Sequence, residues 1–392
     1  MPCMFSAKRA AEHSARKRMI SHVYSKSFIQ GSQAAKEQAR EIIFGRFLPA
    51  LVKEGGVSGL GTEPAGLDMY SLFMAATMDF IAAYIFGLKG GTNFIRDRAF
   101  REHFLELYKA RNDYGIFDQE LPWLTKICRR WGVSLCPSWV DAANKEMEEW
   151  CGTLCRTMTK MSCLDNFDSG GDVPVVRNAV TKGMGREMDT KGWGSDMSVP
   201  LLTPEVSVPS ELFDHLLAGQ ETAGLVLSYL SWRLSKSLEL QEELRADLLS
   251  LQPNMQFPVE GGITSGQLPD AKQLDSLPLL HAVLMETLRL HAPIPGPQPR
   301  QSPEHGSRIG EYAIPGGVRV AAMAYSLHRD EEVFPDAETW DHARWLPWTS
   351  TEDELKRRNR HFWAFSSGGR MCIGSNFAMN GDRPLNSIRL GI

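Results

Sequence analysis

A cysteine near the C-terminus lies in a segment rich in glycine, Phe365-Ser366-Ser367-Gly368-Gly369-Arg370-Met371-Cys372-Ile373-Gly374. A thiolate that ligates a metal needs backbone N–H groups around the sulfur, because they stabilise its charge and tune its electron donation. Glycines on both sides of Cys372 let the backbone turn tightly and approach a flat macrocycle without a Cβ clash. Arg370 supplies a fixed cation suited to a carboxylate. A lone cysteine beside such a turn would be a buried structural residue, whereas this combination favours a ligand.

The residues after this cysteine, 375–379, favour a helix whose N-terminal dipole would point at the sulfur. The decapeptide resembles the cysteine loop of the cytochrome P450 family, Phe-x-x-Gly-x-Arg-x-Cys-x-Gly, at every specified position. The resemblance implies that the Cys372 thiolate ligates the iron of haem b and that its electron donation helps cleave an O–O bond. It also implies that Phe365, Arg370 and Gly374 contact the cofactor.

A second motif, Glu286-Thr287-Leu288-Arg289, lies in a predicted helix. Spacing of three places the carboxylate and the guanidinium on one face, where they can pair. Such pairs decorate many surface helices, but the apolar flanking residues favour a buried pair, which needs a further partner. The motif resembles the family's Glu-x-x-Arg motif, with Arg344 as the third member. The family's usual proline and glutamate before that arginine are His342 and Ala343 here. The resemblance implies that the triad is structural and supports the cysteine loop.

A third motif, Ala218-Gly219-Gln220-Glu221-Thr222, lies in a predicted long helix. Gly219 removes a side chain where a ligand could approach, and a mid-helix threonine can bend the backbone by bonding to an earlier carbonyl. An acid beside an alcohol suits proton delivery; the alternative is an ordinary helix that contains a glycine. The motif resembles the family's oxygen-activating helix, which implies that Glu221 and Thr222 steer protons to dioxygen.

Two further resemblances concern cations. Arg300 follows the Glu286 helix at the distance where family members place an arginine that binds a haem propionate. An N-terminal pattern resembles the fungal form of the helix that crosses the haem edge: His13, Arg16, Lys17, Arg18 and Tyr24-Ser25-Lys26-Ser27. Lys17 stands where that pattern has an arginine, and the resemblance implies a cofactor contact. The alternatives are a solvated basic helix and a mitochondrial presequence.

Composition bounds the class of protein. The 392 residues are 43% hydrophobic and 23% charged, as in globular proteins, and the net charge of -4 gives no strong field for nucleic acid or an anionic membrane. Seven sparse cysteines fit a reducing compartment rather than a disulfide framework. Cys151 and Cys155 lack the partners of a zinc site and are interpreted as buried hydrophobes. The apolar stretch 69–87 contains Asp79 and predicts a buried helix rather than a membrane span.

Helical periodicity dominates the chain. It predicts helices over residues 25–53, 67–86, 93–114, 137–160, 207–235, 238–250 and 277–291. Residues 309–313 and 318–323 flank Pro315-Gly316-Gly317 and predict a β-hairpin. Residues 164–200 predict a flexible loop inside one haem-thiolate monooxygenase domain that covers residues 1–392. The expected fold is mainly α with small β-sheets (α+β), a cytochrome P450 fold that is incomplete at both termini.

The resemblance implies a monooxygenase that uses haem and dioxygen, with electrons from NADPH through an NADPH-cytochrome reductase. One oxygen atom would enter a small lipophilic substrate. Residues 24–27 and Ala292-Pro293-Ile294-Pro295-Gly296-Pro297 resemble fungal members that serve secondary metabolism. The alternatives are a truncated, non-catalytic remnant and a haem-thiolate isomerase or dehydratase that needs no reductase, against which Glu221-Thr222 speaks.

Compared with the family, the sequence begins at the helix over the haem, without a membrane anchor or signal. Residues 380–384, Asn-Gly-Asp-Arg-Pro, break the helix that should continue after Cys372. A full-length relative is expected at the cytosolic face of the endoplasmic reticulum membrane. The chain as written is expected to bind haem poorly or to aggregate, because apolar faces would lack their covering elements.

Overall fold

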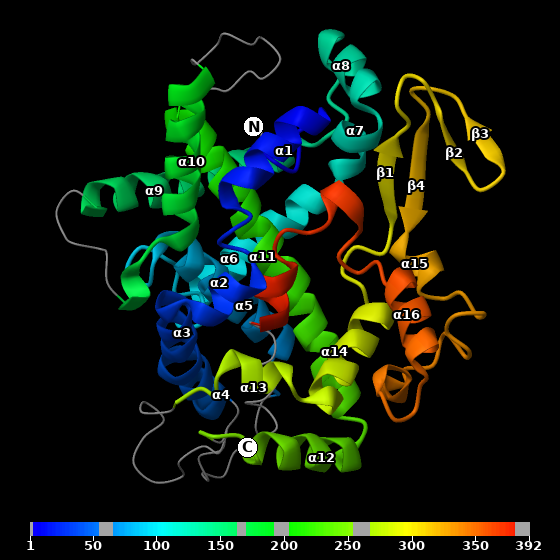
Figure 1. Ribbon diagram of the computed structural model, residues 1–392. Coiled ribbons are helices and arrows are strands. Elements are labelled where there is room, and N and C mark those ends of the chain that lie inside the picture. Colours follow the sequence, from blue (N-terminus) through cyan, green and yellow to red (C-terminus); the bar gives the residue numbers. More distant parts are fainter. Residues whose placement is uncertain (1–2, 55–65, 163–169, 192–203, 254–266, 381–392) are drawn as a thin grey trace. The chain divides into compact units, whose positions relative to one another are not determined.

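The computed structural model describes residues 3–54, 66–162, 170–191, 204–253 and 267–380 (Figure 1). The chain divides into two compact units, residues 1–221 with 258–266 and residues 222–257 with 267–392. Helix α11 (Pro204–Leu234) contains the division, between Glu221 and Thr222.

The described part of the first unit is helical. Its elements are α1 (Ala10–Ile20), α2 (Lys26–Gly31), α3 (Gln33–Arg40), the π-helix η1 (Glu41–Phe47), α4 (Leu48–Glu54), α5 (Met69–Phe86), α6 (Arg98–Asp113), α7 (Gly115–Glu120), α8 (Pro122–Arg130), α9 (Ser138–Ser162), η2 (Gly170–Asp172), α10 (Val175–Lys191) and the first part of α11.

Helix α5 forms the core of the first unit, since every residue from Ser71 to Phe86 is buried. The Asp68 side chain accepts the N–H of Ser71 and caps its first turn, and Gly87, with φ of 78°, ends it. By length and composition alone α5 could cross a membrane, but most of the helix is buried inside the structure. A core helix has the same composition, and the sequence predicted one here.

The predicted loop 164–200 is wrong for its described part, because residues 170–172 and 175–191 form η2 and α10. Val176, Val180 and Met184 are buried at helical spacing, and α10 packs on α1 and α5. The abundant polar and glycine residues of the segment obscured this apolar stripe. Residues 164–169 and 192–200 lie outside the described part.

The predicted helix over residues 25–53 is divided into shorter ones. Ser32 is extended, and its side chain accepts the N–H of Ala35, so the chain restarts there as α3. Ser32 is thus both the C-cap of α2 and the N-cap of α3, so the helical pattern of residues 25–53 is interrupted there.

The described part of the second unit combines helices with two small sheets. Its elements are the rest of α11, α12 (Leu238–Leu249), α13 (Ala271–Asp275), α14 (Pro278–Leu290), β1 (Pro297–Gln301), β2 (Ser307–Ile309), β3 (Tyr312–Ile314), β4 (Arg319–Met323), α15 (Ala324–Leu327), η4 (His342–Trp345), α16 (Glu352–His361) and η5 (Gly368–Arg370), followed by helical residues 375–380.

The strand pairing differs from the predicted hairpin of residues 309–313 with 318–323. Strand β4 pairs antiparallel with β1, Pro297 opposite Met323, while β2 pairs with β3 (Figure 1). The turn between β2 and β3 is Gly310-Glu311, and Gly310 has φ of 57°. Glycine at the first position of a two-residue turn favours a tight hairpin. Residues 309–313 therefore contain this turn, and the strand before it pairs with the strand after it. The predicted second strand, residues 318–323, pairs instead with β1, which lies outside the predicted hairpin.

Candidate active site

The loop that carries Cys372 is closed by its own backbone. The Cys372 N–H donates to the Phe365 carbonyl at 2.8 Å, and the Met371 N–H donates to that of Gly368 at 3.0 Å. Gly368 has φ of 70°, a conformation that glycine adopts without strain. The Cys372 side chain is exposed, and the helical residues begin three positions later.

The surroundings of this loop fit a flat cofactor ligated through sulfur. A Cβ built on Gly368 or Gly369 would meet nothing within 4 Å, so open space faces both glycines. A Cβ on Gly374 would lie 3.9 Å from the Cys372 sulfur. Phe365 and Arg370 are half-buried within the loop. The exposed sulfur and the open space at these two glycines leave this loop accessible to a cofactor.

Arg300 of β1 lies against the same loop. Its Nη2 donates to the Ser366 hydroxyl at 3.0 Å and to the Ser367 carbonyl at 3.4 Å. The sequence resemblance placed Arg300 at a propionate, and the structure puts its guanidinium within one hydrogen bond of the cysteine loop. Ser366, the acceptor, was not singled out from the sequence.

Glu286 and Arg289 form a bidentate pair on α14. Arg289 Nε and Nη2 each donate to a different carboxylate oxygen of Glu286 at 2.8 Å, and both side chains are 0% exposed. The remaining donors of Arg289 bond to the carbonyls of His328, Ala337 and Thr339 at 2.7–3.1 Å. The guanidinium is therefore saturated, as a buried cation must be.

The carboxylate of Glu286 has further partners from the segment that precedes the cysteine loop. It accepts the N–H of Asp341 at 2.9 Å and the indole N–H of Trp345 at 2.9 Å. Arg344 Nε lies 3.5 Å from Glu286 Oε1, so the third residue expected of the triad is an ion-pair neighbour, and its Nη2 donates to the Asp336 carbonyl. Asp341 and Trp345 flank Arg344 but were not predicted as partners.

Helix α11 contains the glycine–acid–alcohol motif. A Cβ on Gly219 would lie 2.6 Å from the Ile81 side chain, so the glycine admits α5 rather than the ligand that the sequence suggested. Glu221 Oε2 accepts the Tyr108 hydroxyl of α6 at 2.6 Å, a contact missed from the sequence. Thr222 is half-buried and follows Glu221 directly along the helix.

Lys17 lies in α1 of the first unit and is half-buried. The buried cation of this helix is its neighbour Arg16, whose Nη1 lies 2.9 Å from a carboxylate oxygen of Glu211 in α11. Burial raises the pKa of Glu211, while Arg16 lowers it. The structure thus uses Arg16 to join α1 to α11, and a cofactor role for Lys17 stays a prediction.

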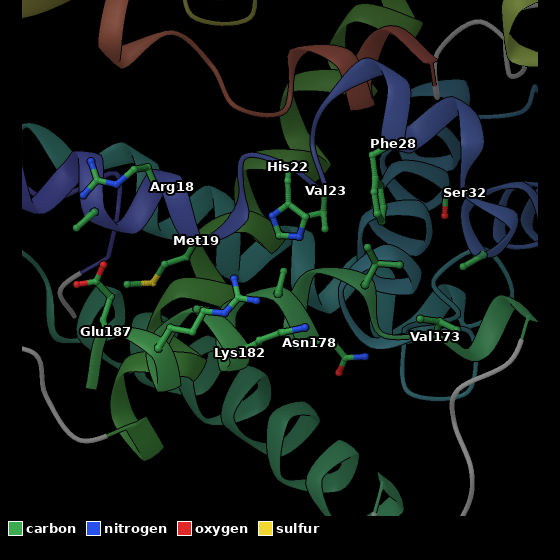
Figure 2. Close-up of a pocket in the computed structure, with 16 residues that line it drawn as sticks. Arg18, Met19, His22, Val23, Phe28, Ser32, Val173, Asn178, Lys182 and Glu187 are labelled. Atoms are coloured by element: carbon green, nitrogen blue, oxygen red, sulfur yellow. The ribbon is translucent and has the colours of Figure 1, made fainter. Parts of the chain in front are cut away.

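A pocket of about 490 Å³ opens elsewhere in the first unit, between α1 and α10 (Figure 2). Met19, Val23 and Phe28 form part of its apolar wall, and Arg18 and Lys182 are among its polar lining residues. It contains none of the site residues predicted from the sequence.

The sequence is similar to known cytochrome P450 proteins. The sequence profile described as Cytochrome P450 matches residues 196–381. The chain is 27% identical to cytochrome P450 monooxygenase avaI of Aspergillus versicolor, over 98% of this chain and 82% of that protein. It is 38% identical to cytochrome P450 monooxygenase aflV of Aspergillus parasiticus and 35% identical to stcB of Emericella nidulans. Each of these two matches covers 41% of this chain but only 28% of the relative.

A solved structure, described as the crystal structure of the cytochrome P450DA heme domain, has the same fold. The TM-score is 0.64 at 17% sequence identity, over 96% of this chain and 69% of that chain. Residues 196–381 thus match the cytochrome P450 family, and the fold of the chain is that of a cytochrome P450 heme domain.

Proposed function

We propose that this chain is a haem-thiolate monooxygenase in which Cys372 ligates the iron of haem b. The reaction inserts one atom of dioxygen into a small lipophilic substrate and releases the other as water. When bound, the haem supplies the one-electron and dioxygen chemistry that amino-acid side chains lack. Electrons come from NADPH through an NADPH-cytochrome reductase, and a full-length relative acts at the cytosolic face of the endoplasmic reticulum membrane.

One observation carries the proposal: the exposed Cys372 side chain lies in a closed loop with open space in front of Gly368 and Gly369. A structural cysteine would be buried, as Cys151 and Cys155 are in α9. Exposure combined with a fixed backbone is what a metal-ligating thiolate needs.

The remaining site residues have distinct roles in this proposal. Arg300, Arg370 and Lys17 neutralise the cofactor's carboxylates, and Phe365 and Gly374 pack against its ring. Glu221 and Thr222 hold and pass protons that the reduction of dioxygen consumes. The 2.6 Å hydrogen bond from the Tyr108 hydroxyl holds the Glu221 carboxylate in a defined position.

The biological setting is proposed from the relatives. The named monooxygenases come from Aspergillus and Emericella species, and residues 24–27 and 292–297 resemble fungal members in style. We therefore propose an enzyme of fungal secondary metabolism, with a lipophilic metabolite as substrate.

The test is the absorption spectrum of the reduced, CO-bound protein after reconstitution with haem. In the fraction of protein that takes up haem, which is expected to be small, the chain and a Cys128→Ser control should both show the Soret band typical of thiolate ligation, because Cys128 lies in α8 of the other unit. Cys372→Ser should lose that band. Equal spectra for the chain and for Cys372→Ser would refute the proposal, as would a chain that binds no haem.

A further inference from the structure

His328 lies fully buried between the Glu286–Arg289 pair and the segment that leads into the cysteine loop. Its Nδ1 is 2.7 Å from the Arg289 carbonyl, and the Trp363 N–H donates to its Nε2 at 2.7 Å. The ring also stacks on Phe362, with centroids 5.4 Å apart and an interplanar angle of 17°. His328 is 0% exposed.

These two partners define one tautomer of the ring. The Trp363 N–H can only donate, so Nε2 must accept; the Arg289 carbonyl can only accept, so Nδ1 must carry the proton. The ring is therefore neutral, and burial, the main cause, lowers the pKa of His328 to about 4. A second proton on Nε2 would break the bond to Trp363.

The contact between His328 and α14 is reciprocal. Arg289 Nη1 donates to the His328 carbonyl at 2.7 Å, while the His328 ring donates to the Arg289 carbonyl. The same guanidinium holds Glu286. The buried pair therefore sets the position of the His328 ring. Moving the ring would break its hydrogen bond to Arg289 and disturb the bond between Arg289 and the His328 carbonyl.

On its other side, the ring orders the start of the loop. Trp363 holds a tight turn, because the Ser366 N–H donates to its carbonyl at 2.9 Å. Phe365, two residues after Trp363, supplies the carbonyl that accepts the Cys372 N–H. An acceptor fixed beneath the Trp363 N–H therefore limits where the Phe365 carbonyl, and with it Cys372, can lie.

We propose that His328 is a positioning residue that transmits the order of the buried Glu286–Arg289 pair to the thiolate loop through its hydrogen bond to the Trp363 backbone. It touches neither the cofactor nor Cys372 in this role. The inference rests on the proposed function for its consequence at the thiolate, but the hydrogen bond itself is testable without haem.

Three variants separate the two bonds of the ring. His328→Gln puts an amide oxygen at about the reach of Nε2, so it can accept from Trp363. His328→Asn puts an amide nitrogen at about the reach of Nδ1, so it can donate to the Arg289 carbonyl and leaves Trp363 without an acceptor. His328→Phe retains the stack on Phe362 and loses both bonds.

The first measurement is hydrogen–deuterium exchange of residues 362–366 in the haem-free protein. We expect exchange at Trp363 to be roughly tenfold faster, or more, in the Asn and Phe variants than in the wild type, because the hydrogen bond to the buried His328 ring protects its amide. The Gln variant should exchange like the wild type. The Gln/Asn comparison does not require the aromatic variant to fold.

The second measurement is the fraction of the reduced, CO-bound protein that shows the thiolate Soret band after haem reconstitution. This fraction should fall at least about threefold in the Asn and Phe variants and recover in the Gln variant. Unchanged exchange and unchanged spectra in all three variants would overturn the proposal, as would equal loss in the Gln and Asn variants. A wild-type chain without the band would refute the proposed function, while exchange would still decide the role of His328.

Discussion

Arg300 Nη2 donates to the hydroxyl of Ser366 at 3.0 Å, and Ser366 is held at φ of 61°. A non-glycine residue in this left-handed region is strained by about 1–3 kcal/mol. The interaction with Arg300 therefore stabilises a conformation that the backbone of a serine would otherwise avoid. It ties β1 to the loop of Cys372.

The first prediction separates the strain at Ser366 from its hydrogen bond. Ser366→Ala retains the strain and loses the bond, and should lower the free energy of unfolding by about 1 kcal/mol. Ser366→Gly also loses the bond but removes the strain, so it should be the more stable of the two variants. Urea unfolding measures both, and an alanine variant as stable as the glycine variant would contradict the assignment.

The second prediction concerns the buried ion pair. Glu286→Ala leaves the Arg289 guanidinium buried without its carboxylate and removes the acceptor of Asp341 and Trp345, so the loss should be about 3–5 kcal/mol. Glu332, exposed and 3.3 Å from Arg357 in the same unit, provides the control. Glu332→Ala should unfold like the wild type, because exposed pairs contribute little. Similar unfolding of the two variants would be inconsistent with the buried network.

The third prediction uses two glycines of the first unit. A Cβ on Gly87, at φ of 78°, would clash with the Asp172 carbonyl oxygen, whereas one on Gly185 of α10 would meet nothing within 4 Å. Gly87→Ala should lower the melting temperature, with a loss of about 2–3 kcal/mol or more. Gly185→Ala should raise stability by about 0.5–1 kcal/mol, because alanine favours a helix. Calorimetry would reveal the opposite signs.

The fourth prediction concerns the tyrosine that holds Glu221. Tyr108→Phe removes a hydrogen bond to a carboxylate and should cost about 1–2 kcal/mol of stability. Glu221→Gln keeps an acceptor oxygen for Tyr108 but cannot pass a proton as a carboxylate does. The Glu221→Gln variant should therefore unfold like the wild type. After reconstitution with haem it should form less product for each dioxygen consumed than the wild type does. Equal yield of product per dioxygen in the wild type and in Glu221→Gln would remove Glu221 from proton delivery.

The fifth prediction is a loss of stability in mild acid. Burial lowers the pKa values of His215 and His328 to about 4, so the unfolded chain, with ordinary histidines near 6.5, binds more protons between these values. The free energy of unfolding falls as pH drops through this window, by on the order of 2 kcal/mol per histidine at about pH 5. Burial raises the pKa values of Asp79 and Glu211, which contribute with the opposite sign.

The control for this pH effect is His215→Gln. It should show a smaller difference in unfolding free energy between about pH 7 and about pH 5 than the wild type, because one buried histidine no longer requires a proton on unfolding. Identical pH dependence of the two proteins would show that His215 titrates normally in the folded state.

Local features of the chain were predictable from sequence. Helix α5 follows from an apolar run bounded by Asp68 and Gly87, and the Glu286–Arg289 pair follows from a spacing of three within a helix. The tight loop of Cys372 follows from glycines at fixed positions. The pair and the loop depend on residues within one or two turns of one another, and helix α5 depends on one continuous run of residues, so local sequence carries the signal for each.

Long-range partners were decided only by tertiary structure. Nothing in the sequence near Glu286 indicated Asp341 and Trp345, and nothing near Glu221 indicated Tyr108. The pairing of β4 with β1 overrode a local hairpin signal in the same way. Local spacing determined which groups could do chemistry, while the packing of distant segments decided what holds them, because a buried polar group takes its partner from whatever the fold brings within reach.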